Sequence, residues 1–185
     1  IRRIRNLIRR YKNAQGELRV IPFAIVDLLE ELAADARMQL PELHVRVECE
    51  PSLTVDADRG LVRTALAEVV SNACRECKLR GTDGPSMILT CVRRDDRARI
   101  AVEDNALPVT EVLLPDVFAE DASTYRSQGK GSGLGLAIVK ETFMRHGGRC
   151  DLVENTTTDG SRRPGVTFWA DLAASVPRED QDHVR

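Results

Sequence analysis

The stretch from 129 to 148, GKGSGLGLAIVKETFMRHGG, joins a glycine-dense turn to a helical pattern. Gly131, Gly133 and Gly135 allow the backbone to approach an anion closely, and a helix N-terminus directs free N–H groups at such an anion. The two closing glycines predict a C-cap, so we expect a helix from about Gly133 to His146. The pattern predicts a phosphate-binding turn, and the alternative is a flexible helix entry without a ligand.

This turn does not follow the two common phosphate-binding motifs. Lys130 is followed by Gly131 rather than by Ser or Thr, which excludes a Walker loop. No strand leads directly into the turn and its third glycine is misplaced, which excludes the dinucleotide-binding G-x-G-x-x-G motif. Since the turn alone does not identify a known site, its function has to be inferred together with a second segment of the sequence.

That second segment is ALAEVVSNACREC, residues 65–77, within a helix expected over 58–78. At about 100° per residue, Glu68, Asn72 and Arg75 share one face of this helix. A carboxylate can orient or deprotonate a nucleophile, an amide oxygen suits Mg²⁺, and a guanidinium suits phosphate. A solvated polar face is the alternative. An apolar stripe on another side predicts the buried face: Val62, Leu66, Val69, Val70, Ala73 and Cys77.

Cys74 and Cys77 form a C-x-x-C spacing near the end of the same helix. A reactive pair of this kind has its thiolate stabilised at a helix N-terminus, whereas the dipole at a C-terminus opposes a thiolate. A zinc site would need two further ligands, for which His146 and Cys150 are the only candidates at short spacing. We therefore expect two buried thiols that serve packing.

Outside these segments, helical and alternating patterns predict a two-layer α/β (α+β) sandwich, with a mixed, mostly antiparallel sheet and helices on one face. The polar, glycine-containing part of 106–132 is typical of a lid or of a disordered insert. The other expected elements are helices over 1–12 and from Pro22 to before Pro41, strands over 43–50, 86–94, 97–104, 149–155 and 165–172, and a disordered tail from about 177.

The composition bounds the class of protein. The 185 residues are 42% hydrophobic with a formal net charge of −2, and charges of both signs alternate, so nucleic acid is not an expected partner. Five irregularly spaced cysteines suggest free thiols in a reducing, cytosolic setting. No run approaches the length of a membrane span. The sequence starts inside an apparent helix without Met, which suggests a fragment of a longer chain.

Taken together, these segments resemble the GHKL ATPases, the superfamily of histidine kinases, DNA gyrase, HSP90 and MutL. Residues 65–77 look like the N box, VEDNALPV (102–109) the first glycine box, Phe118 the F box, GKGSGLGLAIVK the second glycine box, and GVTFWADL (165–172) the closing strand. The resemblance covers about residues 18–173. The G-x-G-L-G-L element with a helix ending in H-G-G is specific to the histidine kinase branch, and VDAD (55–58) looks like the junction to the dimerisation helices.

The resemblance implies a Bergerat fold that holds ATP and Mg²⁺ between the N-box helix and the lid. It implies that Asn72 binds Mg²⁺, that Arg75 lies near the phosphates, that Asp104 takes the adenine amino group, and that Thr167 supports that contact through water. The phosphates would be held by Lys130 and the turn, which comprises Gly131, Ser132, Gly133, Leu134, Gly135 and Leu136.

Two departures from the family pattern leave alternatives open. The first glycine box normally reads D-x-G-x-G, but Ala106 and Pro108 replace both glycines; Ala fits only where φ is negative, and Pro removes an N–H. A degenerate docking domain without nucleotide is the resulting alternative. Glu68 stands where most histidine kinases carry Asn, and in gyrase-type ATPases and related serine kinases a Glu there is the general base. That favours hydrolysis or serine phosphorylation as the other alternative.

The resulting interpretation is the catalytic, ATP-binding domain of a cytoplasmic sensor histidine kinase, with or without a membrane anchor in its parent chain. Residues 1–16 would end a dimerisation helix, 17–174 would form the catalytic domain, and 175–185 the tail. The expected partners are the parent's own dimerisation and histidine phosphotransfer domain, a response regulator receiver domain, and a second copy in a homodimer. His44, His146 and His183 all look structural or solvated, so we expect the phosphoacceptor histidine to precede Ile1.

Overall fold

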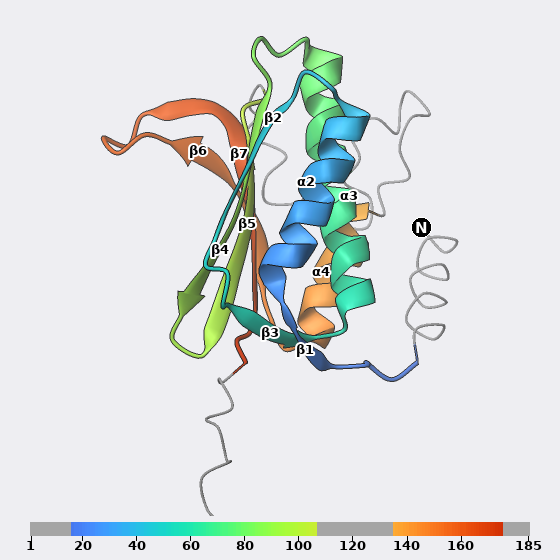
Figure 1. Ribbon diagram of the computed structural model, residues 1–185. Coiled ribbons are helices and arrows are strands. Elements are labelled where there is room, and N and C mark those ends of the chain that lie inside the picture. Colours follow the sequence, from blue (N-terminus) through green and yellow to red (C-terminus); the bar gives the residue numbers. More distant parts are fainter. Residues whose placement is uncertain (1–15, 107–134, 176–185) are drawn as a thin grey trace, which may run out of the picture.

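The computed structural model describes residues 16–106 and 135–175 and has two layers, as predicted (Figure 1). The expected helix at 1–12, the lid beyond Ala106 with Phe118, and the tail from 177 lie outside the described residues. In chain order the elements are β1 (Ile21–Ala24), α2 (Ile25–Gln39), β2 (His44–Cys49), β3 (Thr54–Ala57), α3 (Arg59–Arg80), β4 (Ser86–Arg94), β5 (Arg97–Asp104), α4 (Gly135–Arg145), β6 (Cys150–Thr156) and β7 (Arg162–Ala173).

The main sheet has the strand order β2-β4-β5-β7-β6, and α2, α3 and α4 cover one of its faces (Figure 1). Strand β2 runs parallel to β4, and the remaining neighbours pair antiparallel. The sheet is therefore mixed and mostly antiparallel, which confirms the predicted fold class. None of the helices in the described ranges has the length and apolar character needed to cross a membrane.

A second, two-stranded sheet of β1 and β3 was not predicted. Residues 21–24 pair antiparallel with 54–57, from Ile21 opposite Ala57 to Ala24 opposite Thr54. The prediction that Pro22 opens a helix is wrong, because the helix begins only at Ile25. Proline also suits an edge strand, where no partner needs its N–H. The VDAD segment, residues 55–58, forms the end of β3 and the N-cap of α3.

Both ends of the N-box helix α3 are capped by local chemistry. At its start, Asp58 accepts a hydrogen bond from the Leu61 N–H (3.1 Å), and its own N–H donates to His146 Nε2 (3.0 Å). At its end, Gly81 adopts the left-handed conformation with φ of 60°. His146 is thus structural, as predicted, and it ties the end of α4 to the start of α3.

The core lies between the helices and the sheet. The predicted stripe of α3 is buried throughout, and Phe143 of α4 packs against Phe168 of β7 with ring centroids 6.0 Å apart. The predicted C-cap of α4 is confirmed, since Gly147 has φ of 65° and the Gly148 N–H donates to the Phe143 carbonyl (2.9 Å). This packing fixes the relative placement of the two helices that carry the predicted site.

Candidate functional site

The polar face of α3 carries the three residues that helical spacing brought together in the prediction. Asn72 and Arg75 are in contact, since the Arg75 guanidinium donates a hydrogen bond to Asn72 Oδ1. Asn72 and Glu68 are half-buried, whereas Arg75 is exposed. Asn72 offers an amide oxygen on a partly exposed face of α3, and such an oxygen is a hard ligand of the kind that Mg²⁺ prefers. The donor chemistry at this position fits the implied metal.

Glu68 lies directly against the first residue of α4. A Cβ built on Gly135 would stand 2.1 Å from Glu68 Oε1 and 2.8 Å from Glu68 Cγ, which no side chain can occupy without displacing the glutamate. The absence of a side chain at 135 thus allows the start of α4 to pack on the polar face of α3. The structure thus brings the N box and the start of the second glycine-box helix together.

The rest of the second glycine box is only partly described. Leu136 is half-buried and packs against the core, which orients the first turn of α4. Lys130 and the turn residues from Gly131 to Leu134 lie outside the described residues. Their expected contacts with phosphate stay predictions.

Asp104 ends β5 as a buried carboxylate with 6% of its surface exposed. Its Oδ1 accepts a hydrogen bond from the Ala106 N–H at 2.9 Å. Burial raises the pKa of Asp104 to about 6; the N–H groups of Ala106 and Val166 oppose this rise, and the charges of Glu76 and Glu103 add to it. A carboxylate held in an apolar setting is a specific acceptor for an amino group.

The altered first glycine box is compatible with ordinary backbone geometry where it is described. Asp95 is the only non-glycine residue with positive φ in the described ranges, so Ala106 has a negative φ and carries no strain from its side chain. Ala106 is 3% exposed and joins the core cluster. Asn105 holds the start of β4, because its Oδ1 accepts from the Ser86 N–H at 2.8 Å. Pro108 lies outside the described residues.

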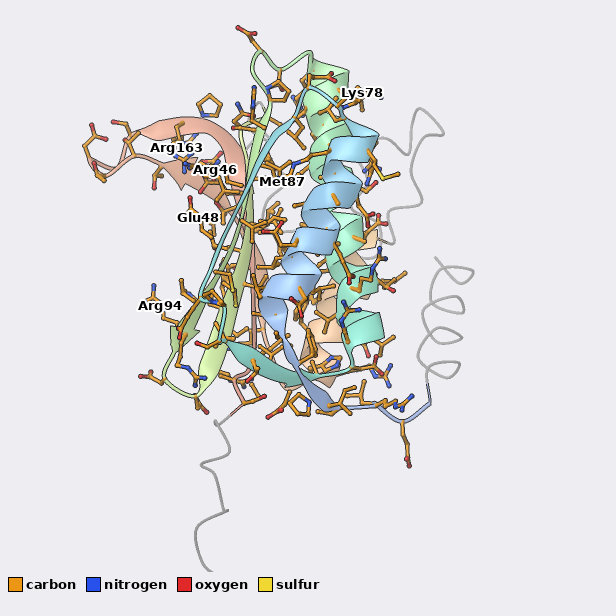
Figure 2. All side chains as sticks on the ribbon, viewed as in Figure 1. Arg46, Glu48, Lys78, Met87, Arg94 and Arg163 are labelled. Atoms are coloured by element: carbon orange, nitrogen blue, oxygen red, sulfur yellow. The ribbon has the colours of Figure 1, made fainter. Side chains whose placement is uncertain are left out.

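The side chain of Thr167 lies on the face of the sheet away from the helices, so its expected support of the adenine contact through water stays a prediction. Side chains alternate along β7, and the core residues Phe168, Ala170 and Leu172 face the helices. Thr167 faces the opposite side of the sheet and pairs with Glu103 in the β5–β7 ladder. Figure 2 shows Arg163, which pairs with Glu103 (2.6 Å), projecting on that side, away from the helices. On β7 it is the backbone N–H of Val166 that contacts the Asp104 carboxylate.

The Thr167 hydroxyl donates a hydrogen bond to Asn155 Oδ1 at 2.7 Å. Asn155 is 2% exposed and donates in turn to the backbone carbonyl of Asp104 at 2.7 Å. Sequence reasoning missed this residue. A polar side chain at the end of the otherwise apolar alternation of 149–155 was the available signal.

The two C-x-x-C thiols are buried, as predicted. Cys74 is 4% and Cys77 is 2% exposed, and all five cysteines are free. Burial raises the pKa of each of these two thiols to about 11, and the nearby Asp104 carboxylate adds to the rise. Such thiols are unreactive near neutral pH. The two cysteines of α3 therefore serve packing, as predicted.

The fold and site combine a two-layer sandwich with a buried carboxylate at the end of β5 and an amide side chain on the polar face of α3. Residues 57–175 match the family described as histidine kinase-, DNA gyrase B-, and HSP90-like ATPase. The chain therefore belongs to this ATPase family.

Similar proteins are sensor kinases. The chain is 31% identical over 154 residues to the sensor-type histidine kinase PrrB of Mycobacterium bovis, covering 80% of this chain and 33% of PrrB. The structure resembles the ATP-binding domain of PrrB from Mycobacterium tuberculosis (TM-score 0.63, 25% identity, 85% of this chain and 98% of that one). It also resembles full-length ShkA in complex with AMPPNP (TM-score 0.70, 25% identity, 86% and 32%). The chain spans about a third of the length of PrrB.

Proposed function

We propose that this chain is the catalytic, ATP-binding domain of a two-component sensor histidine kinase, which transfers the γ-phosphoryl group of ATP to a histidine on a dimerisation domain. The observation that carries the proposal is the packing of Gly135 on Glu68, because it sets the start of α4 beside the polar face of α3. A phosphate at that helix start would lie next to a metal ligand and a guanidinium.

In this proposal each residue has a positional task. Asn72 contributes its amide oxygen to Mg²⁺, and bound Mg²⁺ would neutralise charge on the phosphates. Arg75 and Lys130 approach the phosphates as cations, and the turn from Gly131 to Leu136 offers backbone N–H groups. Asp104 accepts the adenine amino group.

Glu68 supports a second candidate function. Its carboxylate lies at the first residue of α4, where it could orient a water or a serine hydroxyl for attack. A neutral histidine is already nucleophilic and needs little deprotonation, so a histidine kinase does not depend on such a base. A GHKL ATPase or serine kinase would depend on it. The nucleotide-free docking domain is less well supported, because Ala106 adopts an unstrained backbone beside an intact Asp104.

We also propose that residues 1–16 form the end of a dimerisation helix, and the chain is anchored on the domain where it leaves this segment. The Arg19 N–H donates to Asp58 Oδ2 (3.1 Å), and the Arg145 guanidinium donates to the Gly16 carbonyl (2.9 Å). These bonds hold the entering chain against the start of α3 and the end of α4. We further propose a cytoplasmic homodimer that passes its phosphoryl group to a response regulator receiver domain.

The binding step is tested by calorimetric titration with AMPPNP, with and without Mg²⁺. We expect saturable binding that Mg²⁺ strengthens, and a loss of about tenfold or more in the Mg²⁺-dependent affinity of Asn72→Ala. Ser71→Ala, a half-buried polar neighbour on the same helix, is the matched control and should bind like the wild type. No saturation at millimolar nucleotide would refute both enzymatic candidates, and an unchanged Asn72→Ala titration would refute the metal-ligand role.

A further inference from the structure

Asn155 occupies a break in the ladder between β6 and β7. Regular pairing ends at Glu154 opposite Val166 and resumes at Thr156 opposite Arg162, with an irregularity between. Within this bulge the buried Asn155 side chain donates to the carbonyls of Asp104 (2.7 Å) and Pro164 (3.1 Å) and accepts from the Thr167 hydroxyl (2.7 Å). Both amide hydrogens and the amide oxygen are thus used. Bulges commonly re-aim side chains next to functional sites.

The ladder between β5 and β7 ends at the same place. Its last pair is Glu103 opposite Thr167, so the carbonyl of Asp104 lies just beyond the regular strand pairing. The Asn155 amide takes the place of a strand partner for that carbonyl. Without this donor the buried carbonyl would lack a hydrogen bond from the strand or the side chain, which is costly.

Gly165 completes the arrangement through its lack of a side chain. Its φ is +98°, and a Cβ there would stand 1.8 Å from the Asp104 carbonyl oxygen and 2.7 Å from Asn155 Nδ2. The backbone of β7 is therefore pressed against the same carbonyl that Asn155 holds. Asp104 is fixed from two directions: its backbone by Asn155, and its carboxylate by the N–H groups of Ala106 and Val166.

We propose that Asn155 is a positioning residue for base recognition, which fixes Asp104 so that its carboxylate meets the exocyclic amino group of adenine. This inference rests on the proposed ATP-binding function and extends it to the choice of base. Hydrogen bonds weaken steeply when their angle departs from linearity, so a carboxylate released from its backbone anchor discriminates less well between an amino and an oxo group. Asn155 acts through Asp104 and does not itself contact the base.

The test compares ATP with ITP, whose base carries an oxo group in place of the amino group. Calorimetry with Mg²⁺ is carried out on the wild-type chain, Asn155→Ala and Asn105→Ala. Asn105 is a matched control, because it also makes two side-chain hydrogen bonds beside Asp104, but to Ser86 and Gly84 at the start of β4. We expect Asn155→Ala to lose about tenfold in ATP affinity with ITP affinity unchanged, and Asn105→Ala to keep the wild-type ratio.

A purely structural role predicts a different result, since partial unfolding lowers the affinities for ATP and ITP by the same factor. An unchanged ATP-to-ITP ratio in Asn155→Ala would overturn the proposal. A wild-type chain that binds neither nucleotide would instead refute the proposed function. In that case, a measurement that needs no ligand tests whether Asn155 positions Asp104.

That readout is the titration of the Asp104 carboxyl carbon followed by NMR. Burial raises the pKa of Asp104 to about 6. Release of its backbone in Asn155→Ala should admit water and move this pKa down toward its ordinary value, while Asn105→Ala should leave it in place. An Asp104 pKa that is the same in wild type and Asn155→Ala would contradict the positioning role.

Discussion

Replacement of Asp104 by Asn should stabilise the folded chain at the expense of nucleotide binding. Burial disfavours the charged form of Asp104, and its pKa of about 6 lies above the ordinary value of 3.8. Above pH 6 the folded protein therefore holds a buried carboxylate that costs free energy relative to the unfolded chain. A neutral amide removes that cost and retains an oxygen to accept the Ala106 N–H.

The size of the effect follows from the shift in pKa. At about 1.4 kcal/mol per pKa unit, a change from 3.8 to about 6 corresponds to about 3 kcal/mol at pH 8. An amide hydrogen left without a partner would offset about 1 to 2 kcal/mol of this gain. We expect Asp104→Asn to be more stable than the wild type by about 1 to 2 kcal/mol at pH 8.

The assay is urea unfolding of both proteins between pH 8 and pH 4. A folded-state pKa above the unfolded-state value means that the penalty is complete above pH 6 and vanishes as the pH falls to the ordinary value of 3.8. The stability difference should therefore shrink across that interval. Calorimetry should show that the variant loses ATP affinity. A stability difference that is absent at pH 8, or that grows as the pH falls, would refute the reasoning.

Three further predictions concern the helices that form the site. Gly135→Ala should lower ATP affinity by about tenfold, because the added Cβ would collide with the side chain of Glu68. In a double-mutant cycle, a second substitution that shortens Glu68 should recover part of this loss. Cys74 and Cys77 should resist alkylation by iodoacetamide at pH 8 until urea unfolds the chain, since burial raises their pKa values to about 11; rapid labelling of the folded chain would contradict this. Arg75→Met should weaken binding of ATP more than of adenosine, whereas Lys78→Met, which removes the same charge near the end of α3 (Figure 2), should change neither measurement by more than about twofold.

The features predicted correctly depend on short-range patterns. The buried stripe of α3, the strand pair β4–β5 and the glycine cap of α4 each follow from periodicity or backbone freedom within a few residues. The shared face of Asn72 and Arg75 likewise follows from their spacing on one helix, and their side chains are in contact. Local physics is sufficient for such features because the residues involved are already neighbours along the chain.

The features that were missed depend on contacts between distant segments. Pro22 has the local sequence pattern of a helix start, but its segment pairs with β3, more than 30 residues away. This tertiary pairing overrides the local preference for a helix. Asn155 forms a hydrogen bond with Asp104, which is 51 residues away in the sequence, and the bulge that allows this contact has no local sequence pattern that predicts it. The face that Thr167 presents depends on the register of β7 against β5, and a change of register by one residue would reverse it.

The most direct test of the central claim is phosphoryl transfer from radiolabelled ATP to a dimerisation domain supplied separately from the same protein, with wild type and Glu68→Gln compared. If the chain is a histidine kinase, the phosphorylated product should be labile in acid and stable in base. Wild type and Glu68→Gln should form it at similar rates, because a neutral histidine needs no general base. The account would be contradicted by release of inorganic phosphate or formation of an acid-stable phosphoserine that disappears in Glu68→Gln.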